Sequence, residues 1–248
     1  MQIPAIHIHN ATLTYQNRVI FSNLNLSIPA GTWVGLIGPS GVGKTSLLRA
    51  IANLPSPEAH FSGSIETDNG IAASTQTAYL PQSDLLLPWL TVIQNITLRS
   101  KLQRQRGDEA RLLHEKAELL LDKVKLSHAR DLYPHQLSGG MRQRAALVRV
   151  LLEEKPIMLL DEPFSAVDAI TRYQLHGLAI ELMQHKTVLF ITHDPTEALR
   201  LAHLIYILQG DPVTLKQLVT LSTTTPRTLP NPVDLHMQNS LFEQLAAQ

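Results

Sequence analysis

The chain has 248 residues, enough for one or two domains and a sizeable buried core. Its 44% hydrophobic residues fit neither a disordered chain nor a fibrous repeat. Lys plus Arg and Asp plus Glu both number 21, so no overall positive charge attracts a nucleic acid, and no cysteine is present to form disulfides, thiolate metal sites or a nucleophile. We therefore predict a globular protein of a reducing compartment, in which any anion site is local.

Neither a secretory signal nor a membrane-spanning segment is predicted. Residues 1–10 lack a basic region followed by an apolar run. The longest apolar runs, such as Leu204–Leu208, are far shorter than the ~18–20 residues needed to cross a bilayer. The chain itself is therefore not expected to cross a membrane.

The first part of the chain alternates between apolar and polar side chains, as at Ile6 and Ile8 and again at Leu13 and Tyr15. This alternation is typical of antiparallel strands with one solvated face. Further along, short runs that are apolar on both faces recur with helical stretches between them, which predicts a buried, mainly parallel sheet covered by helices. We therefore predict an α/β core with an added N-terminal antiparallel β element, the buried strands being 33–37, 157–160, 188–191 and 204–208.

A helical subdomain is predicted as an insert over residues 88–154. One helix follows start signals at residues 107–109 and has an apolar seam, and a second, at 141–154, begins after Ser138, which can cap it. The seam consists of Leu113, Ala117, Leu120 and Val124. We expect one main domain over 1–220 and a C-terminal piece over 221–248, made of a linker at 222–232 and a short helix at 241–246.

Residues 38–45, directly after the predicted strand 33–37, have the pattern of a phosphate-binding loop. Its glycines allow consecutive backbone N–H groups to surround a phosphate, and the following helix adds a fractional positive charge at its N-terminus. Lys44 would bring a full charge to the β- and γ-phosphate oxygens, and Thr45 would offer its hydroxyl to Mg²⁺. A turn that only starts a helix explains neither residue. We therefore predict a P-loop NTPase core that binds nucleotide through Gly38, Pro39, Ser40, Gly41, Val42, Gly43, Lys44, Thr45 and Ser46.

Two adjacent carboxylates, Asp161 and Glu162, follow the predicted strand 157–160. The carboxyl ends of parallel strands are where such sheets bind ligands. We expect Asp161 to hold Mg²⁺, directly or through water, and Glu162 to act as the general base that polarises an attacking water. The alternative is that the pair only caps a helix after the strand.

The segment Leu137–Gln143, with the sequence Leu-Ser-Gly-Gly-Met-Arg-Gln, resembles the signature of the nucleotide-binding subunits of ABC transporters. Ser138 followed by two glycines at a helix start can bind an anion, because it combines a hydroxyl, bare N–H groups and a helix dipole. In that family this helix start faces the γ-phosphate of ATP on the opposite subunit. The resemblance implies a head-to-tail pair of chains around two ATP molecules, contacted by Ser138, Gly139 and Gly140. Met141 departs from the pattern, since the family has glutamine there.

Other residues match the family in chain order. Tyr15 resembles the aromatic residue that stacks on adenine, with a strand core residue as the alternative. Gln82 resembles the glutamine that senses Mg²⁺ and water, with a plain loop amide as the alternative, and Asp168 ends a loop that resembles the one crossing the dimer interface. His193, after a predicted core strand, resembles the switch histidine that contacts the γ-phosphate. The resemblance implies the catalytic residues Glu162, His193 and Gln82 and the metal ligands Thr45, Gln82 and Asp161.

The resemblance also implies an ATPase whose dimer closes on ATP, reopens on hydrolysis and so drives another protein. Residues 84–90 hold many apolar side chains for a loop, which is typical of a groove for a partner helix, although they could equally pack the helical subdomain. In the family this region contacts a membrane permease, and residues 87–92 resemble ATPases of nitrate, sulfonate, taurine and thiamine-precursor importers. We expect a second copy, a transmembrane permease and, indirectly, a solute-binding protein as partners, ATP and Mg²⁺ as cofactors, and a peripheral location at the cytoplasmic face of the inner membrane.

Two other functions compete with an importer ATPase. A soluble ABC-type ATPase of DNA repair or cofactor assembly would have no membrane partner, but the repair proteins carry a long coiled coil between the phosphate loop and the signature, and no heptad run separates Lys44 from Ser138. A nucleotide-gated binding module without hydrolysis would not need Glu162 and His193. Co-purification with a multi-span membrane protein would separate the importer from both.

Overall fold

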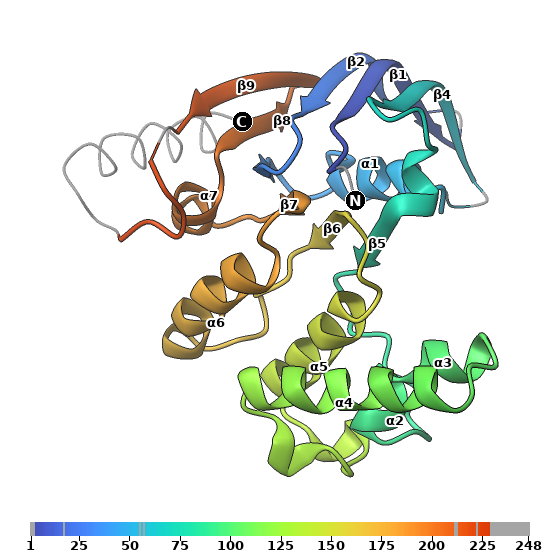
Figure 1. The fold of residues 1–248 in the computed structure, drawn as a ribbon. Helices are drawn as coiled ribbons and strands as arrows, with labels where there is room; N and C mark the ends of the chain where they lie inside the picture. Colours follow the sequence, from blue (N-terminus) through green and yellow to red (C-terminus); the bar gives the residue numbers. More distant parts are fainter. Residues whose placement is uncertain are drawn as a thin grey trace. The chain divides into compact units, whose positions relative to one another are not determined.

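A computed structural model describes residues 3–16, 18–54, 56, 58–210, 213–221 and 223–228 (Figure 1). The contacts divide the chain into two units. The core unit lies within Met1–Tyr79, Lys155–Glu162 and Met183–Gln248, and the helical unit within Leu80–Glu154 and Pro163–Leu182.

The core unit begins with an antiparallel sheet in the order β2-β1-β4. Ile6 and Ile8 of β1 are fully buried, whereas the intervening side chains are more exposed, so the alternation in the sequence marks the buried face. The strands are β1 (Ile6–Tyr15), β2 (Arg18–Ile28) and β4 (Ala59–Thr67). The predicted N-terminal antiparallel element is confirmed, and β4 extends it with a strand that the sequence analysis did not predict.

A second sheet of six strands has the order β5-β6-β7-β3-β8-β9. Every residue of β3, β6 and β7 is buried, as expected for strands covered on both faces, and β3 pairs in parallel with β7 and β8. Among the strand pairs of this sheet whose register the structure describes, only β8–β9 is antiparallel. The strands are β3 (Trp33–Ile37), β5 (Thr77–Leu80), β6 (Ile157–Asp161), β7 (Thr187–Ile191), β8 (Leu204–Gln209) and β9 (Thr214–Thr220).

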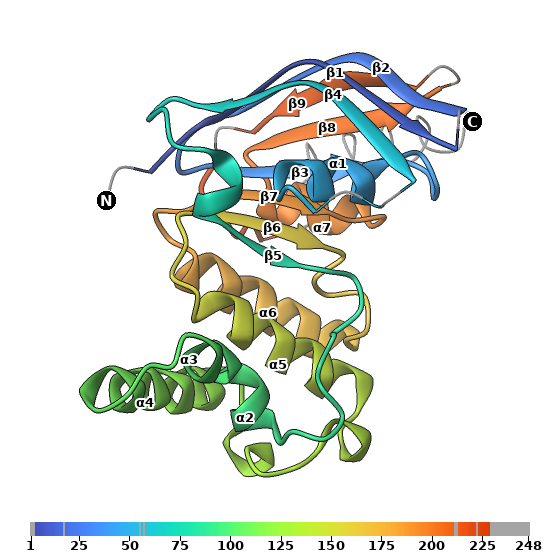
Figure 2. The same ribbon diagram turned by 90° about the vertical axis from the view of Figure 1, so that its right-hand side faces the viewer.

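The core of this unit lies around helix α1 (Lys44–Ile51). Figure 2 shows α1 between the antiparallel sheet and strands β6 and β7. Leu47, Leu48 and Ile51 of α1 belong to one buried apolar cluster with residues of both sheets. Helix α7 (Pro195–Leu201) contacts β3, and a short 3₁₀ helix, η1 (Ala73–Gln76), precedes β5. The packing of α1 therefore fixes the start of this helix beside the carboxyl ends of the parallel strands.

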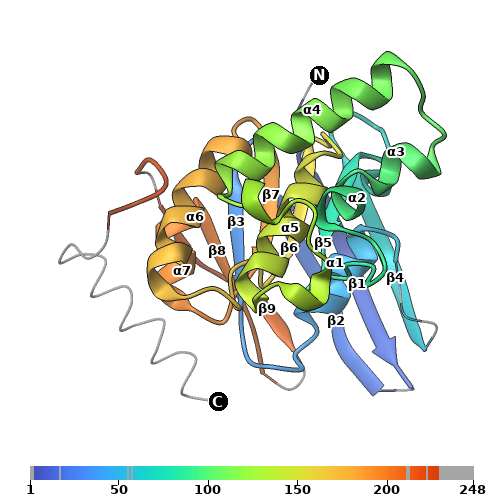
Figure 3. The same ribbon diagram turned by 90° about the horizontal axis from the view of Figure 1, so that it is seen from below.

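The helical unit has its own apolar core, in which α2, α4 and α5 pack together (Figure 3). Of the predicted seam, Ala117 of α4 and Val124, the C-cap residue of this helix, are buried, and Leu113 and Leu120 pack against the same apolar core. The helices are α2 (Val92–Ile96), α3 (Leu98–Leu102), α4 (Asp108–Lys123), η2 (Ser127–Ala129), η3 (Pro134–Gln136), α5 (Gly139–Leu151) and α6 (Ala169–Leu182). The seam predicted from the sequence therefore faces the interior of this unit.

The predicted fold class is confirmed: an α/β core with a mainly parallel sheet, an N-terminal antiparallel element and a helical insert. One boundary was wrong, because α5 ends at Leu151 and not at Glu154, whose φ of 53° is left-handed. The short helix predicted at 241–246 and residues 222 and 229–232 of the predicted linker lie outside the described residues, and the domain bounds stay a prediction. Among the residues that the structure describes, no helix is long and apolar enough to span a bilayer.

Candidate nucleotide-binding site

The predicted phosphate loop lies between β3 and α1. Gly43 precedes the first turn of α1 with a φ of 99°, and a Cβ added there would lie 2.6 Å from Cγ2 of Ile20. Gly38 is equally restricted, since a Cβ would lie 2.3 Å from the carbonyl oxygen of Leu208. The first turn of α1 has neither a side-chain cap nor an acidic residue. Its N–H groups are therefore available to an anion.

The side chain of Lys44 lies beneath this loop and is only 8% exposed. Its Nζ donates hydrogen bonds to the carbonyl oxygens of Gly38 at 2.8 Å and Pro39 at 2.7 Å. Burial lowers the pKa of Lys44, while the nearby carboxylates of Glu162 and Asp161 act in the opposite direction. Both carboxylates thus act on the charge of the ammonium group, although they lie at the end of a different strand, β6.

Asp161 is the last residue of β6 and is almost completely buried. It pairs with Ile191 of β7, and Ile191 lies next to Leu36 of β3, so the ends of three parallel strands are abreast. Burial raises the pKa of Asp161, and hydrogen bonds from the hydroxyls of Thr45 and Tyr79 counteract this. The structure thus brings Thr45 and Asp161 together, as their predicted shared metal site requires.

The oxygen atoms of Thr45 and Asp161 fit a magnesium ion. Mg²⁺ is usually bound by one or two carboxylates together with substrate phosphates and water, and not by a cage of protein ligands. Among the described residues, no cluster of three or more His, Cys, Asp or Glu side chains could hold a metal ion. The donors present are therefore those of a site completed by phosphate oxygens.

Tyr79 is a residue of this site that the sequence analysis missed. It lies on β5, and burial, followed by the charge of Asp161, raises its pKa to about 12, so that its hydroxyl keeps its proton. The neutral phenol donates a hydrogen bond to the carboxylate of Asp161. The only signal in the sequence was a tyrosine in the apolar run 78–80.

Glu162 and His193 lie close together beyond the ends of β6 and β7. Glu162 has a left-handed φ of 49°, and its N–H donates a hydrogen bond to the carbonyl oxygen of Ile191 at 3.1 Å. Nδ1 of His193 lies 3.4 Å from Oε1 of Glu162, and the histidine side chain is 67% exposed. The left-handed backbone turns the chain directly after Asp161, so the two neighbouring carboxylates have different surroundings.

Tyr15 ends β1 and is 40% exposed, so it is not a core residue of the strand. Trp33 and Phe21, the other aromatic residues of this region, are buried. A hydrogen bond to Glu58 raises the pKa of the Tyr15 phenol. Tyr15 is therefore accessible to a ligand.

The remaining predicted residues belong to the helical unit. Ser138 is the N-cap of α5, and its Oγ accepts a hydrogen bond from the N–H of Met141 at 3.2 Å. A Cβ added to Gly140 would lie 3.4 Å from the carbonyl oxygen of Ala166, so the start of α5 contacts the predicted interface loop. Oδ1 of Asp168 accepts a hydrogen bond from the N–H of Thr171, which lowers the pKa of Asp168. The structure thus brings Ser138, Gly139, Gly140 and the loop ending in Asp168 into one cluster.

Gln82 is exposed in the segment that follows β5. The apolar loop beyond it divides into a buried residue, Leu86, and two strongly exposed ones, Leu85 and Trp89, at 60% and 68%. Arg149 of α5 holds this loop by donating to the carbonyl oxygens of Leu85 and Asp84, each at 2.8 Å. Packing of the helical unit therefore accounts for Leu86 but not for Leu85 and Trp89.

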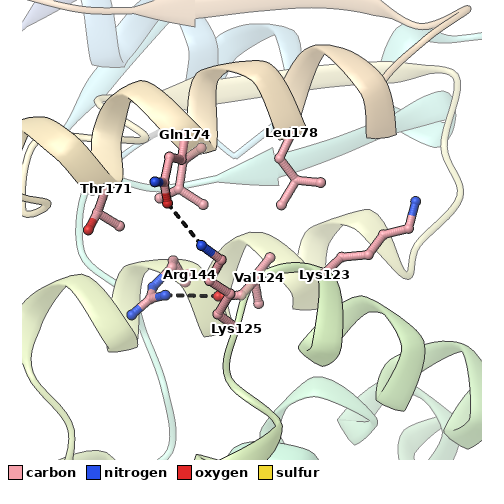
Figure 4. Close-up of a pocket in the computed structure, with 8 residues that line it drawn as sticks. Lys123, Val124, Lys125, Arg144, Thr171, Gln174 and Leu178 are labelled. Carbon is pink, nitrogen blue, oxygen red and sulfur yellow. Dashed lines mark hydrogen bonds between the residues drawn. The ribbon is translucent and has the colours of Figure 1, made fainter.

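A separate pocket of about 350 Å³ lies between α4, α5 and α6 of the helical unit (Figure 4). Each cation on its wall already has a partner. Lys123 pairs with Glu181 at 2.7 Å, Lys125 donates to Gln174 at 3.1 Å, and Arg144 donates to the carbonyl oxygen of Val124 at 2.8 Å. The wall consists of Lys123, Val124, Lys125, Arg144, Thr171, Gln174, Leu175 and Leu178, and none of the predicted site residues is among them.

Comparison with known proteins agrees with this arrangement. Residues 21–165 match the ABC transporter family. An uncharacterized ABC transporter ATP-binding protein of Haemophilus influenzae is 36% identical over 246 residues, which cover 98% of this chain and 99% of the relative. The aliphatic sulfonates import ATP-binding protein SsuB of Bacillus subtilis is 36% identical over 221 residues, covering 88% of this chain and 83% of the relative.

Solved structures give the same result. The ATP-binding cassette MJ0796, in a dimeric post-hydrolysis state bound to ADP and Pi, superposes with a TM-score of 0.75 at 28% identity, over 88% of this chain and 100% of that chain. A putative metal-chelate type ABC transporter in an inward-facing conformation gives a TM-score of 0.70 at 26% identity, over 86% of this chain and 83% of that chain. The resemblance seen in the sequence is confirmed, and the chain belongs to the ABC transporter family, as one of its ATP-binding subunits.

Proposed function

We propose that this protein is the ATP-hydrolysing subunit of an ABC import system, in which two copies close around two ATP molecules and drive a separate membrane permease. The observation that supports this most directly is the cluster at the carboxyl ends of β3, β6 and β7. There the phosphate loop, Asp161, Glu162 and His193 come together from distant parts of the chain. This cluster combines groups that bind phosphate with a base for water.

In the proposed reaction the loop N–H groups and Lys44 bind the β- and γ-phosphates. Mg²⁺, held by oxygens of Thr45 and Asp161, would neutralise phosphate charge. Glu162 orients a water in line with the γ-phosphate and accepts its proton, and His193 lies beside Glu162, where it can contact the same phosphate. Tyr15 would stack on the adenine ring.

Two copies are needed in this proposal because, in the family that the chain resembles, the segment that corresponds to Ser138 faces the ATP of the opposite subunit. Ser138, Gly139 and Gly140 would contact the γ-phosphate bound to the partner copy, and Asp168 would lie at the interface between the copies. Gln82 would report on Mg²⁺ and the attacking water. Relatives solved as dimers support this assembly.

The exposed side chains Leu85 and Trp89 support a permease as the membrane partner, because apolar residues held outward by a loop are suited to a partner helix. The subunit would then lie peripherally at the cytoplasmic face of the inner membrane, and a solute-binding protein would act through the permease. Relatives from several organisms are named as aliphatic sulfonates import ATP-binding proteins. We therefore place an aliphatic sulfonate first among the solutes, before nitrate, taurine or a thiamine precursor.

The test of this proposal is the variant Glu162→Gln. Removal of the base should slow hydrolysis by about 100-fold or more, since general bases contribute at least that much. Nucleotide binding should remain, and the variant should accumulate a stable dimer with ATP and Mg²⁺ on size-exclusion chromatography. A variant with undiminished turnover would remove Glu162 from its role.

The control combines Glu162→Gln with Lys44→Ala. Without the ammonium group, the loop loses its full charge toward the phosphates, and nucleotide affinity measured by calorimetry should fall. This double variant should stay monomeric under the conditions in which Glu162→Gln dimerises. Unchanged nucleotide binding would contradict the assignment of the phosphate loop.

A further inference from the structure

Gln143 is a buried polar residue on α5, only 8% exposed. Its Oε1 accepts a hydrogen bond from the backbone N–H of Ala166 at 3.0 Å, and its Nε2 donates to Oγ of Ser165 at 3.5 Å. Both partners belong to the loop that ends at Asp168. One side chain of α5 therefore binds the middle of this loop.

The two ends of the loop are held by other contacts. At one end the fully buried ring of Phe164 packs edge-on against His176, with ring centroids 4.7 Å apart. At the other end, the carbonyl oxygen of Asp168 accepts the N–H of Arg172 at 2.8 Å. Ala166 itself is exposed, so the bond from its N–H to Gln143 holds a part of the loop that packing does not hold.

The same part of the loop lies against the start of α5. A Cβ added to Gly140 would lie 3.4 Å from the carbonyl oxygen of Ala166, and one added to Gly139 would lie 3.8 Å from its Cβ. A change in the position of Ala166 would therefore change the packing at both glycines. Ser138, which caps the same helix, immediately precedes them.

We infer that Gln143 is a positioning residue that locks the Ser138–Gly140 segment and the loop 165–168 into one rigid surface for the partner copy. This inference rests on the proposed function, in which both segments face the second copy and its ATP. The amide bonds to Ser165 and Ala166, and the proposed nucleotide contacts of a single protomer lie on the phosphate loop. It acts on dimer closure and leaves nucleotide binding by one protomer unchanged.

The test uses Gln143→Met in the Glu162→Gln background, with ATP and Mg²⁺. Methionine keeps the length of the side chain but leaves the N–H of Ala166 without its partner. A lost hydrogen bond of this kind should raise the dimer dissociation constant about tenfold, measured by analytical ultracentrifugation. The affinity of the monomer for a fluorescent ATP analogue should be unchanged, which also shows that the variant is folded.

Two further variants separate positioning from general stability. Gln143→Glu restores an acceptor for the N–H of Ala166 and should recover most of the dimer affinity. Gln174→Met is a matched control. It removes an amide from α6 of the same unit that, among the described residues, accepts a hydrogen bond from Lys125, and it should not alter dimerisation. Should Gln143→Met fail to fold, Gln143→Asn, whose amide is too short to reach Ala166, replaces it with the same expected loss.

The outcomes distinguish this inference from the proposed function. If Glu162→Gln alone does not dimerise with ATP, the proposed function fails. If it dimerises and Gln143→Met dimerises equally well, only the role of Gln143 is refuted. The role of Gln143 is also refuted if Gln143→Met weakens the dimer but Gln143→Glu does not restore the dimer affinity.

Discussion

At the scale of single residues, the chemistry of the proposed site depends on how burial and neighbouring charges act on each group. The ammonium group of Lys44 is buried against backbone carbonyl oxygens, and Asp161 is buried but receives two hydroxyl donors. Glu162 keeps different surroundings from its neighbour because its backbone is left-handed. Adjacent carboxylates can therefore serve separate purposes, one toward a metal and one toward water.

His203 allows a prediction about pH. Its Nδ1 accepts the N–H of Trp33 at 3.0 Å, which requires an unprotonated nitrogen, and burial, followed by the charge of Arg227, lowers its pKa from the ordinary 6.5. The unfolded chain therefore binds a proton at higher pH than the folded chain. The contribution of neutral His203 to the free energy of unfolding is complete above pH 6.5 and is lost as the pH falls below this value.

The variant His203→Asn checks this, since the asparagine oxygen can still accept from Trp33 but does not titrate. The free energy of unfolding of both proteins should be measured in urea from about pH 5 to 8, the range in which histidine titrates. As the pH falls, it should decrease more steeply for the unaltered chain than for the variant. Parallel pH profiles for the two proteins would show that His203 is not the group responsible.

At the scale of elements, the C-terminal end of α7 is capped by a buried arginine from a later segment of the chain. Arg227 is 6% exposed and donates to the carbonyl oxygens of Leu199 at 2.9 Å and Ala202 at 2.6 Å, and also to Oγ1 of Thr223 at 2.6 Å. A guanidinium at this place satisfies the free carbonyls of the helix end and complements its dipole. It ties the segment after β9 to the helix that follows His193.

Arg227→Met should therefore lower the free energy of unfolding by about 3 kcal/mol, because buried carbonyl oxygens are left without a donor. Denaturant unfolding measures this directly. Arg111→Met is the control: its side chain is 69% exposed and pairs only at the surface, so its effect should stay within about 0.5 kcal/mol. Equal effects for the two arginines would mean that the helix end does not depend on Arg227.

At the scale of the whole molecule, the permease surface can be tested in a complex. We predict that the tagged chain, expressed in its natural host and extracted in detergent, co-purifies with a multi-span membrane protein. Trp89→Ser should reduce the yield of the complex, because it removes an indole that is 68% exposed, while ATP binding by the free chain remains.

The matched control is Leu119→Ser, which removes an equally exposed apolar residue, at 67%, from α4 of the same unit. It should leave the complex intact. Equal losses for the two variants would show that any exposed apolar side chain of this unit has the same effect, and that Trp89 is not a specific contact of the permease. Purification of the unaltered chain without any membrane protein would favour the competing function, a soluble ATPase.

The outcome of the sequence analysis differs between local and distant features. Local patterns predicted several elements at their observed positions: the strands 33–37 and 157–160 and the helix cap at Ser138. Apolar runs and capping residues act over short distances along the chain, so a sequence pattern is enough to find them. The strands β4 and β9 were missed. Many of their residues are only partly buried or exposed, so their sequences carry no strong periodicity, and pairing with a neighbouring strand stabilises them.

The sequence by itself determined the phosphate loop, the carboxylate pair and membership of the family, because each of these is a contiguous pattern whose chemistry depends on neighbouring residues. Only the tertiary structure decided which groups meet. The hydrogen bond of Tyr79 to Asp161, the contact of His193 with Glu162 and the bond of Gln143 to Ala166 all join separate segments. Such contacts depend on strand order and helix packing, and no local pattern of residues records them.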